Sequence, residues 1–170
     1  MLLLENLSVG NPHGRVLDGV DLIVRRGETY GLVAADPRSR VVVIELLQGR
    51  RRPDRGRVRV DGLDPVSDAA LLTDRACLLD PALWGDPIDG FADILLVEAA
   101  ADQHRALERL LAGVRTCGRH PPVTVLVLTD DLPLAARVCE RVGHLGGHGN
   151  GSSHHLAGTT RPTLQRPPEK

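Results

Sequence analysis

The chain has 170 residues, of which 42% are hydrophobic and 25% charged, and its formal net charge is −1 at pH 7. This length can bury one sizeable core, and the composition is ordinary for a globular domain. The near-neutral charge gives no general attraction to nucleic acid or to an acidic surface. No apolar run reaches the roughly 18 residues of a membrane span, and residues 1–4 are too few for a signal peptide. We therefore expect a cytoplasmic location.

The first half of the chain predicts strands, with one ambiguous segment. Residues 2–9 and 15–25 alternate as antiparallel strands do, and residues 11–14 form the turn between them. Residues 29–33 form a short apolar strand, and a further strand is expected at 57–60. The run Val-Val-Val-Ile at 41–44 is β-branched, so its intrinsic propensity favours a strand.

The second half predicts a parallel sheet covered by helices. Strands are expected at 76–79, 94–97 and 123–128, and the last two are continuous apolar runs suited to a sheet buried on both faces. Helices are expected at 102–114 and 132–141. Residues 146–170 lack apolar periodicity. We therefore expect one α/β domain over residues 1–145 and a disordered tail over 146–170.

Short motifs in a fixed order link residues 1–65 to a known family. They are Leu7-Ser8-Val9, Val16-Leu17-Asp18-Gly19-Val20, Arg26-Gly27-Glu28, Gly31-Leu32-Val33, Leu47-Gln48-Gly49, Pro53-Asp54-Arg55-Gly56 and Asp61-Gly62. The segment resembles the front half of an ABC-transporter ATP-binding subunit. The resemblance implies a RecA-like sheet of the P-loop NTPase type, preceded by an antiparallel β-subdomain. It also implies a helix over 40–48, with Ser39 as a possible N-cap and Gly49 as its stop.

The segment aligned with the phosphate loop departs from the family's pattern. A P-loop reads G-x-x-x-x-G-K-[ST], so that backbone N–H groups and a lysine surround the phosphates. Here the two glycines are replaced by Ala34 and Ser39, the lysine by Arg40, and the hydroxyl positions by Val41 and Val42; the chain's one lysine is Lys170. Asp36 adds a carboxylate, and Pro37 removes an N–H donor. Arg38, Ser39 and Arg40 are thus candidates for a vestigial phosphate loop, because its arginines could attract an anion at a helix N-terminus.

Two later segments resemble the family's catalytic strands. Residues 92–100 are similar to the Walker B segment, and the resemblance places Glu98 at the Mg²⁺-associated position. Ala99 then occupies the position of the carboxylate that orients the attacking water, and alanine cannot polarise water. Residues 124–142 are similar to the switch segment, in which Asp130 replaces a histidine. We therefore expect no catalytic residue.

A whole subdomain of the family has no counterpart here. Only fourteen residues, 80–93, separate Leu79 from Ile94. The family has several dozen residues there, which include a helical subdomain and an LSGGQ segment. The sole tryptophan, Trp84, lies in this short connection. We expect it to pack on the sheet, and a contact with a partner is the alternative.

Other clusters of polar residues predict neither a metal site nor nucleic-acid binding. His144, His148, His154 and His155 lie in or beside the Gly/Ser-rich tail, without a rigid frame for coordination. Glu98, Asp130 and Asp131 could hold a divalent cation, but exposure to solvent or pairing with Arg38 and Arg40 is favoured. The arginines at 50–52, 55, 57 and 59 have no interleaved aromatic residues, so they are interpreted as a solvated surface.

These observations lead to a hypothesis with two alternatives. The chain is interpreted as a pseudo-ATPase without a cofactor, with an accessory, regulatory or scaffolding role. Its expected partner is an ABC-type ATPase subunit or a membrane permease, which would place it at the inner face of the cell membrane. The first alternative is an ATP-binding subunit that retains ATP and Mg²⁺ through Arg38, Arg40 and Glu98. The second is a decaying gene product that keeps its fold without a selected role.

Overall fold

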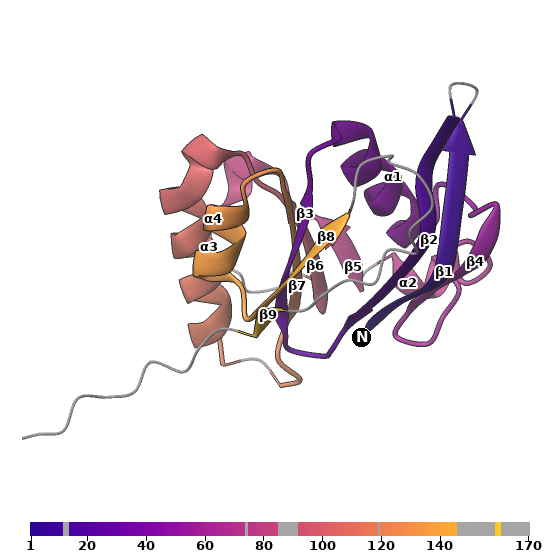
Figure 1. Ribbon diagram of the computed structural model, residues 1–170. Coiled ribbons are helices and arrows are strands. Elements are labelled where there is room, and N and C mark those ends of the chain that lie inside the picture. Colours follow the sequence, from indigo (N-terminus) through magenta and orange to yellow (C-terminus); the bar gives the residue numbers. More distant parts are fainter. Residues whose placement is uncertain (12–13, 74, 85–91, 119, 146–158, 161–170) are drawn as a thin grey trace, which may run out of the picture.

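A computed structural model describes residues 1–11, 14–73, 75–84, 92–118, 120–145 and 159–160, which form two β-sheets with associated helices (Figure 1). A three-stranded sheet has the order β2-β1-β4, and a six-stranded sheet has the order β5-β6-β7-β3-β8-β9. The strands are β1 (Leu2–Asn11), β2 (Gly14–Val24), β3 (Thr29–Ala34), β4 (Arg55–Val60), β5 (Ala76–Leu78), β6 (Ile94–Glu98), β7 (Thr124–Thr129), β8 (Arg141–Leu145) and β9 (Thr159–Thr160). The helices are α1 (Pro37–Leu47), α2 (Ala69–Leu72), α3 (His104–Thr116) and α4 (Leu132–Val138), with 3₁₀ turns η1 (Pro81–Leu83) and η2 (Ala101–Gln103).

The smaller sheet confirms the predicted antiparallel subdomain. The central strand β1 pairs antiparallel with β2 and with β4. On β1, Leu2 and Leu4 are buried while Glu5 is exposed, as expected for strands with one face against a core. The turn predicted at 11–14 includes residues 12 and 13, which lie outside the described part of the chain.

The larger sheet confirms the predicted α/β class. Strands β5, β6, β7, β3 and β8 run parallel, and β9 pairs antiparallel with β8. On β6, Ile94 and Leu96 join the core that contains α1, whereas Leu95 and Val97 join the core that contains α3 and α4. Figure 1 shows α1 between the two sheets and α3 with α4 on the opposite face. The apolar runs were therefore correctly interpreted as strands buried on both faces.

Helix α1 is the helix that the family resemblance implies. The strand favoured by the β-branched run is wrong, because Val42, Val43 and Ile44 are buried in the core between the sheets. The propensity cost of such residues in a helix is only about 0.5 kcal/mol each, less than burying one of them contributes. The N-cap is Asp36, so the expectation of a Ser39 cap is also wrong. Gly49 follows the C-cap with φ of 71°, which confirms it as the stop.

The sequence analysis also misplaced elements near the end of the domain. The helix predicted over 132–141 ends at Val138, and Arg141 instead begins β8, a strand that was not predicted. The guanidinium of Arg141 lies 5.2 Å from the centre of the Tyr30 ring and 3.0 Å from the Glu28 carboxylate. These contacts hold the start of β8 beside β3. Residues 146–170 were predicted to be a disordered tail. Of these residues, the structure describes β9, and the others lie outside the described part of the chain.

Trp84 confirms the expected packing on the sheet. Its side chain is 4% exposed and belongs to the core cluster that includes Leu79, Leu95 and Val97. It directly follows η1, in the short connection where the family resemblance implies a helical subdomain. No helix in the described part of the chain is long and apolar enough to cross a membrane.

Candidate functional site

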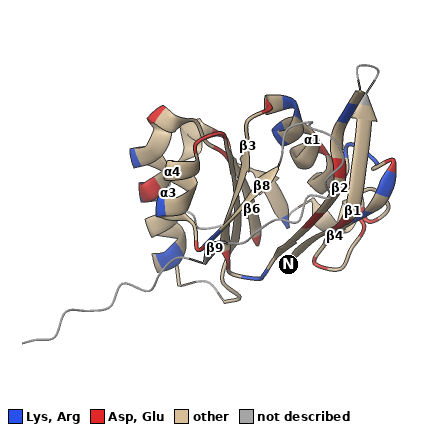
Figure 2. Ribbon diagram, viewed as in Figure 1, with Lys and Arg blue, Asp and Glu red and all other residues tan. Residues whose placement is uncertain are grey.

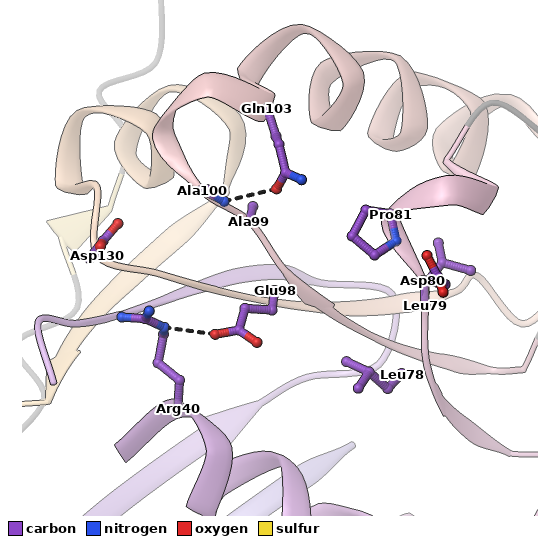
Figure 3. A pocket seen from close by; sticks show the side chains of 10 residues that line it. All are labelled: Arg40, Leu78, Leu79, Asp80, Pro81, Glu98, Ala99, Ala100, Gln103 and Asp130. Atoms are coloured by element: carbon purple, nitrogen blue, oxygen red, sulfur yellow. Dashed lines mark hydrogen bonds and ion pairs between the residues drawn. The ribbon is translucent and has the colours of Figure 1, made fainter. Parts of the chain in front are cut away.

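A cavity of about 470 Å³ lies at the carboxyl ends of β5, β6 and β7 (Figure 3). Ligands of α/β proteins bind at this edge of a parallel sheet, which makes the cavity the candidate site. The residues that line it are Arg40, Leu78, Leu79, Asp80, Pro81, Glu98, Ala99, Ala100, Gln103 and Asp130.

Arg40 projects from the first turn of α1 toward the end of β6. Its Nε donates to Glu98 Oε1 at 3.0 Å, and its Nη1 donates to the carbonyl of Ala34 at 2.6 Å. Figure 3 shows the guanidinium of Arg40 and the Glu98 carboxylate pointing toward each other. The Arg40 side chain is 13% exposed, so this ion pair is shielded from solvent on the arginine side. The charge that could attract a phosphate is therefore largely neutralised within the protein.

The N-terminus of α1 is capped by a side chain of the same loop. Asp36 Oδ1 accepts from the backbone N–H of Arg38 at 2.9 Å, and Pro37 has no N–H to offer. The Asp36 carboxylate thus occupies the place where a helix N-terminus would receive an anion.

Arg38 and Ser39 lie outside the cavity lining. Arg38 is exposed and pairs with Asp36 at 2.8 Å, and this hydrogen bond raises the pKa of the Arg38 guanidinium. Ser39 is buried, and its hydroxyl donates to the carbonyl of Val16 at 3.3 Å. Of the predicted site residues, the structure therefore brings together Arg40, Glu98 and Asp130.

The carboxylates near the cavity have separate partners. Glu98 pairs with Arg40, as favoured from the sequence, whereas the proposed pairing of Arg38 with this group is wrong, because Arg38 binds Asp36. Asp131 caps α4 by accepting from the N–H of Leu134 at 2.9 Å. Within the described residues, no group of three or more His, Cys, Asp or Glu side chains could hold a metal ion.

The sequence analysis missed the wall formed by Leu78, Leu79, Asp80 and Pro81. Asp80 caps η1 by accepting from the N–H of Ala82 at 2.8 Å, and Pro81 is the first residue of that turn. Asp followed by Pro after a strand is a signal for a helical turn, so this wall could have been anticipated. Gln103 was also missed; its Oε1 accepts from the N–H of Ala100 at 3.0 Å.

The arginine-rich segment around β4 lies away from the cavity. Arg51 donates to the carbonyl of Gly10 at 2.7 Å and lies 3.6 Å from Glu45, while Arg59 lies 3.6 Å from Asp64. Figure 2 shows positive and negative residues interspersed near β4 and along the helices. These contacts agree with the interpretation of a solvated surface with both signs of charge.

The parallel sheet, its helices and the antiparallel sheet define the class as an α/β domain of the P-loop NTPase type. No protein-family model matches the chain. The ribose import ATP-binding protein RbsA 1 of Streptomyces avermitilis is 39% identical over 62 residues, covering 36% of this chain and 12% of that protein. The arabinose import ATP-binding protein AraG of Azospirillum brasilense is 26% identical over 148 residues, covering 87% of this chain and 25% of that protein.

Solved structures agree with these relatives on the fold. A structure described as the ATP-binding subunit of an ABC transporter superposes with a TM-score of 0.69 at 14% identity, covering 94% of this chain and 90% of that one. The resemblance is thereby confirmed: the chain is a shortened domain similar to the ATP-binding subunits of ABC transporters. It spans a quarter or less of the length of the two curated relatives.

Proposed function

We propose that this domain is a pseudo-ATPase: a degenerate ABC-type domain that binds partners without binding or hydrolysing ATP. The observation that carries the proposal is the double engagement of Arg40, which donates to Glu98 and to the carbonyl of Ala34. To bind a phosphate, Arg40, whose side chain is 13% exposed, would have to leave the Glu98 carboxylate without this counter-charge. Breaking such a partly buried pair costs free energy that a surface pair would not.

The residues at the cavity also do not fit ATP with Mg²⁺. In place of a ring of N–H donors, the loop presents the Asp36 carboxylate and a proline. Asp80, Glu98 and Asp130 line the cavity, and they would repel a polyphosphate. Ala99, at the water-orienting position of the family, has no group that could activate water. We therefore derive no catalytic step for this site.

Under this proposal the domain acts through contacts, as an accessory, regulatory or scaffolding component. The proposed partner is an ABC-type ATPase subunit or a membrane permease, and the domain would then lie at the cytoplasmic face of the membrane. The named relatives are import proteins for sugars, but a sugar substrate is no part of the proposal.

Calorimetric titration of the purified chain with ATP and Mg²⁺ tests the proposal. We expect no heat of binding up to millimolar nucleotide, which corresponds to binding weaker than about −4 kcal/mol. Binding in the micromolar range would instead identify an ATP-binding subunit in which arginines replace the missing lysine.

The variant Arg40→Ala separates these two functions. If Arg40 replaces the lysine, its removal abolishes nucleotide binding. Under our proposal neither Arg40→Ala nor the unmodified chain gives a heat of binding with ATP. Arg105→Ala is the matched control, because Arg105 is exposed on α3 and does not line the cavity. A loss of partner binding in Arg40→Ala, without a loss in Arg105→Ala, would show that the cavity itself is the contact site.

A further inference from the structure

The cavity offers hydrogen-bond acceptors but few donors. The N–H groups of Leu79, Ala99 and Ala100 already donate, to Leu96, Leu128 and Gln103 respectively, at 2.9 to 3.0 Å. The guanidinium of Arg40 is turned toward Glu98 and Ala34. A ligand that needs donors from the protein, such as a phosphate, therefore has little to bind.

The charge of the lining favours a cation. Among the described lining residues, Asp80, Glu98 and Asp130 are acidic, and Arg40 is the one basic residue. Arg40 neutralises one of these carboxylates, so the cavity keeps an excess of negative charge. Asp130 is exposed at the end of β7, where its carboxylate can meet an incoming group.

One wall of the cavity is apolar. Leu78, Leu79 and Pro81 form it, and the side chain of Leu78 is 40% exposed. Leu83, on the same turn as Pro81, is 41% exposed. A long side chain with an aliphatic stem and a cationic end fits such a combination, because its stem can lie on the apolar wall while its end reaches the carboxylates.

We propose that the cavity receives an arginine side chain from a partner protein, flanked by apolar residues that cover Leu78 and Leu83. This inference rests on the proposed function, because it assigns to a partner a cavity that the proposal leaves without a nucleotide. A guanidinium supplies a planar set of donors to carboxylates. A metal ion is a poorer fit, because the described carboxylates do not form a coordinating group.

Titration of the ¹⁵N-labelled chain with the peptide acetyl-Leu-Arg-Leu-amide tests this inference. We expect saturable shifts of the Ala99, Ala100 and Gln103 amide signals. Acetyl-Leu-citrulline-Leu-amide, which has the same shape without the charge, should bind more weakly by a factor of about 1.4 to 5, which corresponds to the roughly 0.2–1 kcal/mol of one exposed charge pair. Equal affinity for the two peptides would overturn the inference, as would an absence of shifts at these amides.

Two variants, Asp130→Asn and Arg40→Met, test which charged residues of the cavity act on the bound peptide. Asp130→Asn is expected to weaken binding of the arginine peptide about threefold. The control Asp102→Asn, on the exposed η2 turn and outside the cavity lining, should leave it unchanged. Arg40→Met should strengthen peptide binding, because it leaves the Glu98 carboxylate without its counter-charge. Unchanged affinity in Asp130→Asn would contradict the inference even if Arg40→Met does not fold.

Titration of the same labelled sample with ATP and Mg²⁺ separates the two proposals. Shifts with the peptide and none with ATP support both. If neither ligand causes shifts, the pseudo-ATPase proposal stands and the arginine site is rejected. Shifts with ATP alone reject both proposals, and shifts with both ligands reject the pseudo-ATPase proposal alone.

Discussion

Replacing Gly49 with alanine should lower the free energy of unfolding by about 2–5 kcal/mol. Gly49 ends α1 with φ of 71°, a conformation that costs an L-residue about 1–2 kcal/mol. An added Cβ would also lie 2.1 Å from the carbonyl oxygen of Pro65, a backbone atom that cannot rotate away. Because a domain of this size is stable by only about 5–15 kcal/mol, much of the chain's stability would be lost. Urea unfolding followed by circular dichroism measures the change.

Gly62→Ala is the matched control for this effect. Gly62 has φ of 84°, close to that of Gly49, but no atom lies within 4 Å of the position of its added Cβ. It should therefore show the backbone cost alone, about 1–2 kcal/mol. If the two variants lose equal stability, the segment at Pro65 moves aside at little cost, and the close contact does not fix the end of α1.

The central sheet could be predicted because its strands carry a strong local signal. Residues 94–97 and 123–128 are continuous apolar runs, and such runs are required where a strand is buried on both faces. The structure assigns alternate residues of each run to the two cores. Here the local pattern and the tertiary environment favour the same structure.

Helix α1 and strand β8 show where the local signal fails. The β-branched run in α1 favours a strand, but its position between two sheets stabilises a helix whose buried face packs into the core between them. The segment Arg-Val-Gly-His-Leu of β8 has little apolar alternation. It becomes a strand because β3 is already present as a partner, with Tyr30 paired to Arg141. Pairing between strands that are far apart in the sequence cannot be recognised from the residues of one strand alone.

The contacts of the candidate site were predictable only in part. Pairing of Glu98 with Arg38 and Arg40 was favoured from the sequence, and in the structure Arg40 lies 3.0 Å from Glu98 while Arg38 pairs with Asp36. Whether Arg38 would join that pair depends on the direction of the first turn of α1. The cap formed by Asp36 sets that direction and holds Arg38 outside the cavity.

Under the proposed function, rebuilding the loop as a P-loop should create ATP binding that the unmodified chain lacks. The variant carries Ala34→Gly, Asp36→Asn, Pro37→Gly, Ser39→Gly, Arg40→Lys and Val41→Ser. It removes the acidic cap, restores a missing N–H donor and supplies the mobile ammonium of a lysine. We expect the dissociation constant for ATP to fall at least tenfold below the millimolar limit, to about 100 μM or less. Calorimetry with Mg²⁺ present measures this change.

The single variant Arg40→Lys is the control for the rebuilt loop. It supplies the ammonium but leaves Asp36 capping α1 and Pro37 without an N–H, so it should not bind ATP. Even the rebuilt variant should release no phosphate, because Ala99 still stands where the family places the water-orienting carboxylate. Binding by Arg40→Lys alone would show that the identity of the cation is the obstacle. A flat titration of a folded, rebuilt variant would place the obstacle among the carboxylates of the cavity, where Asp130→Asn could then be added to relieve it.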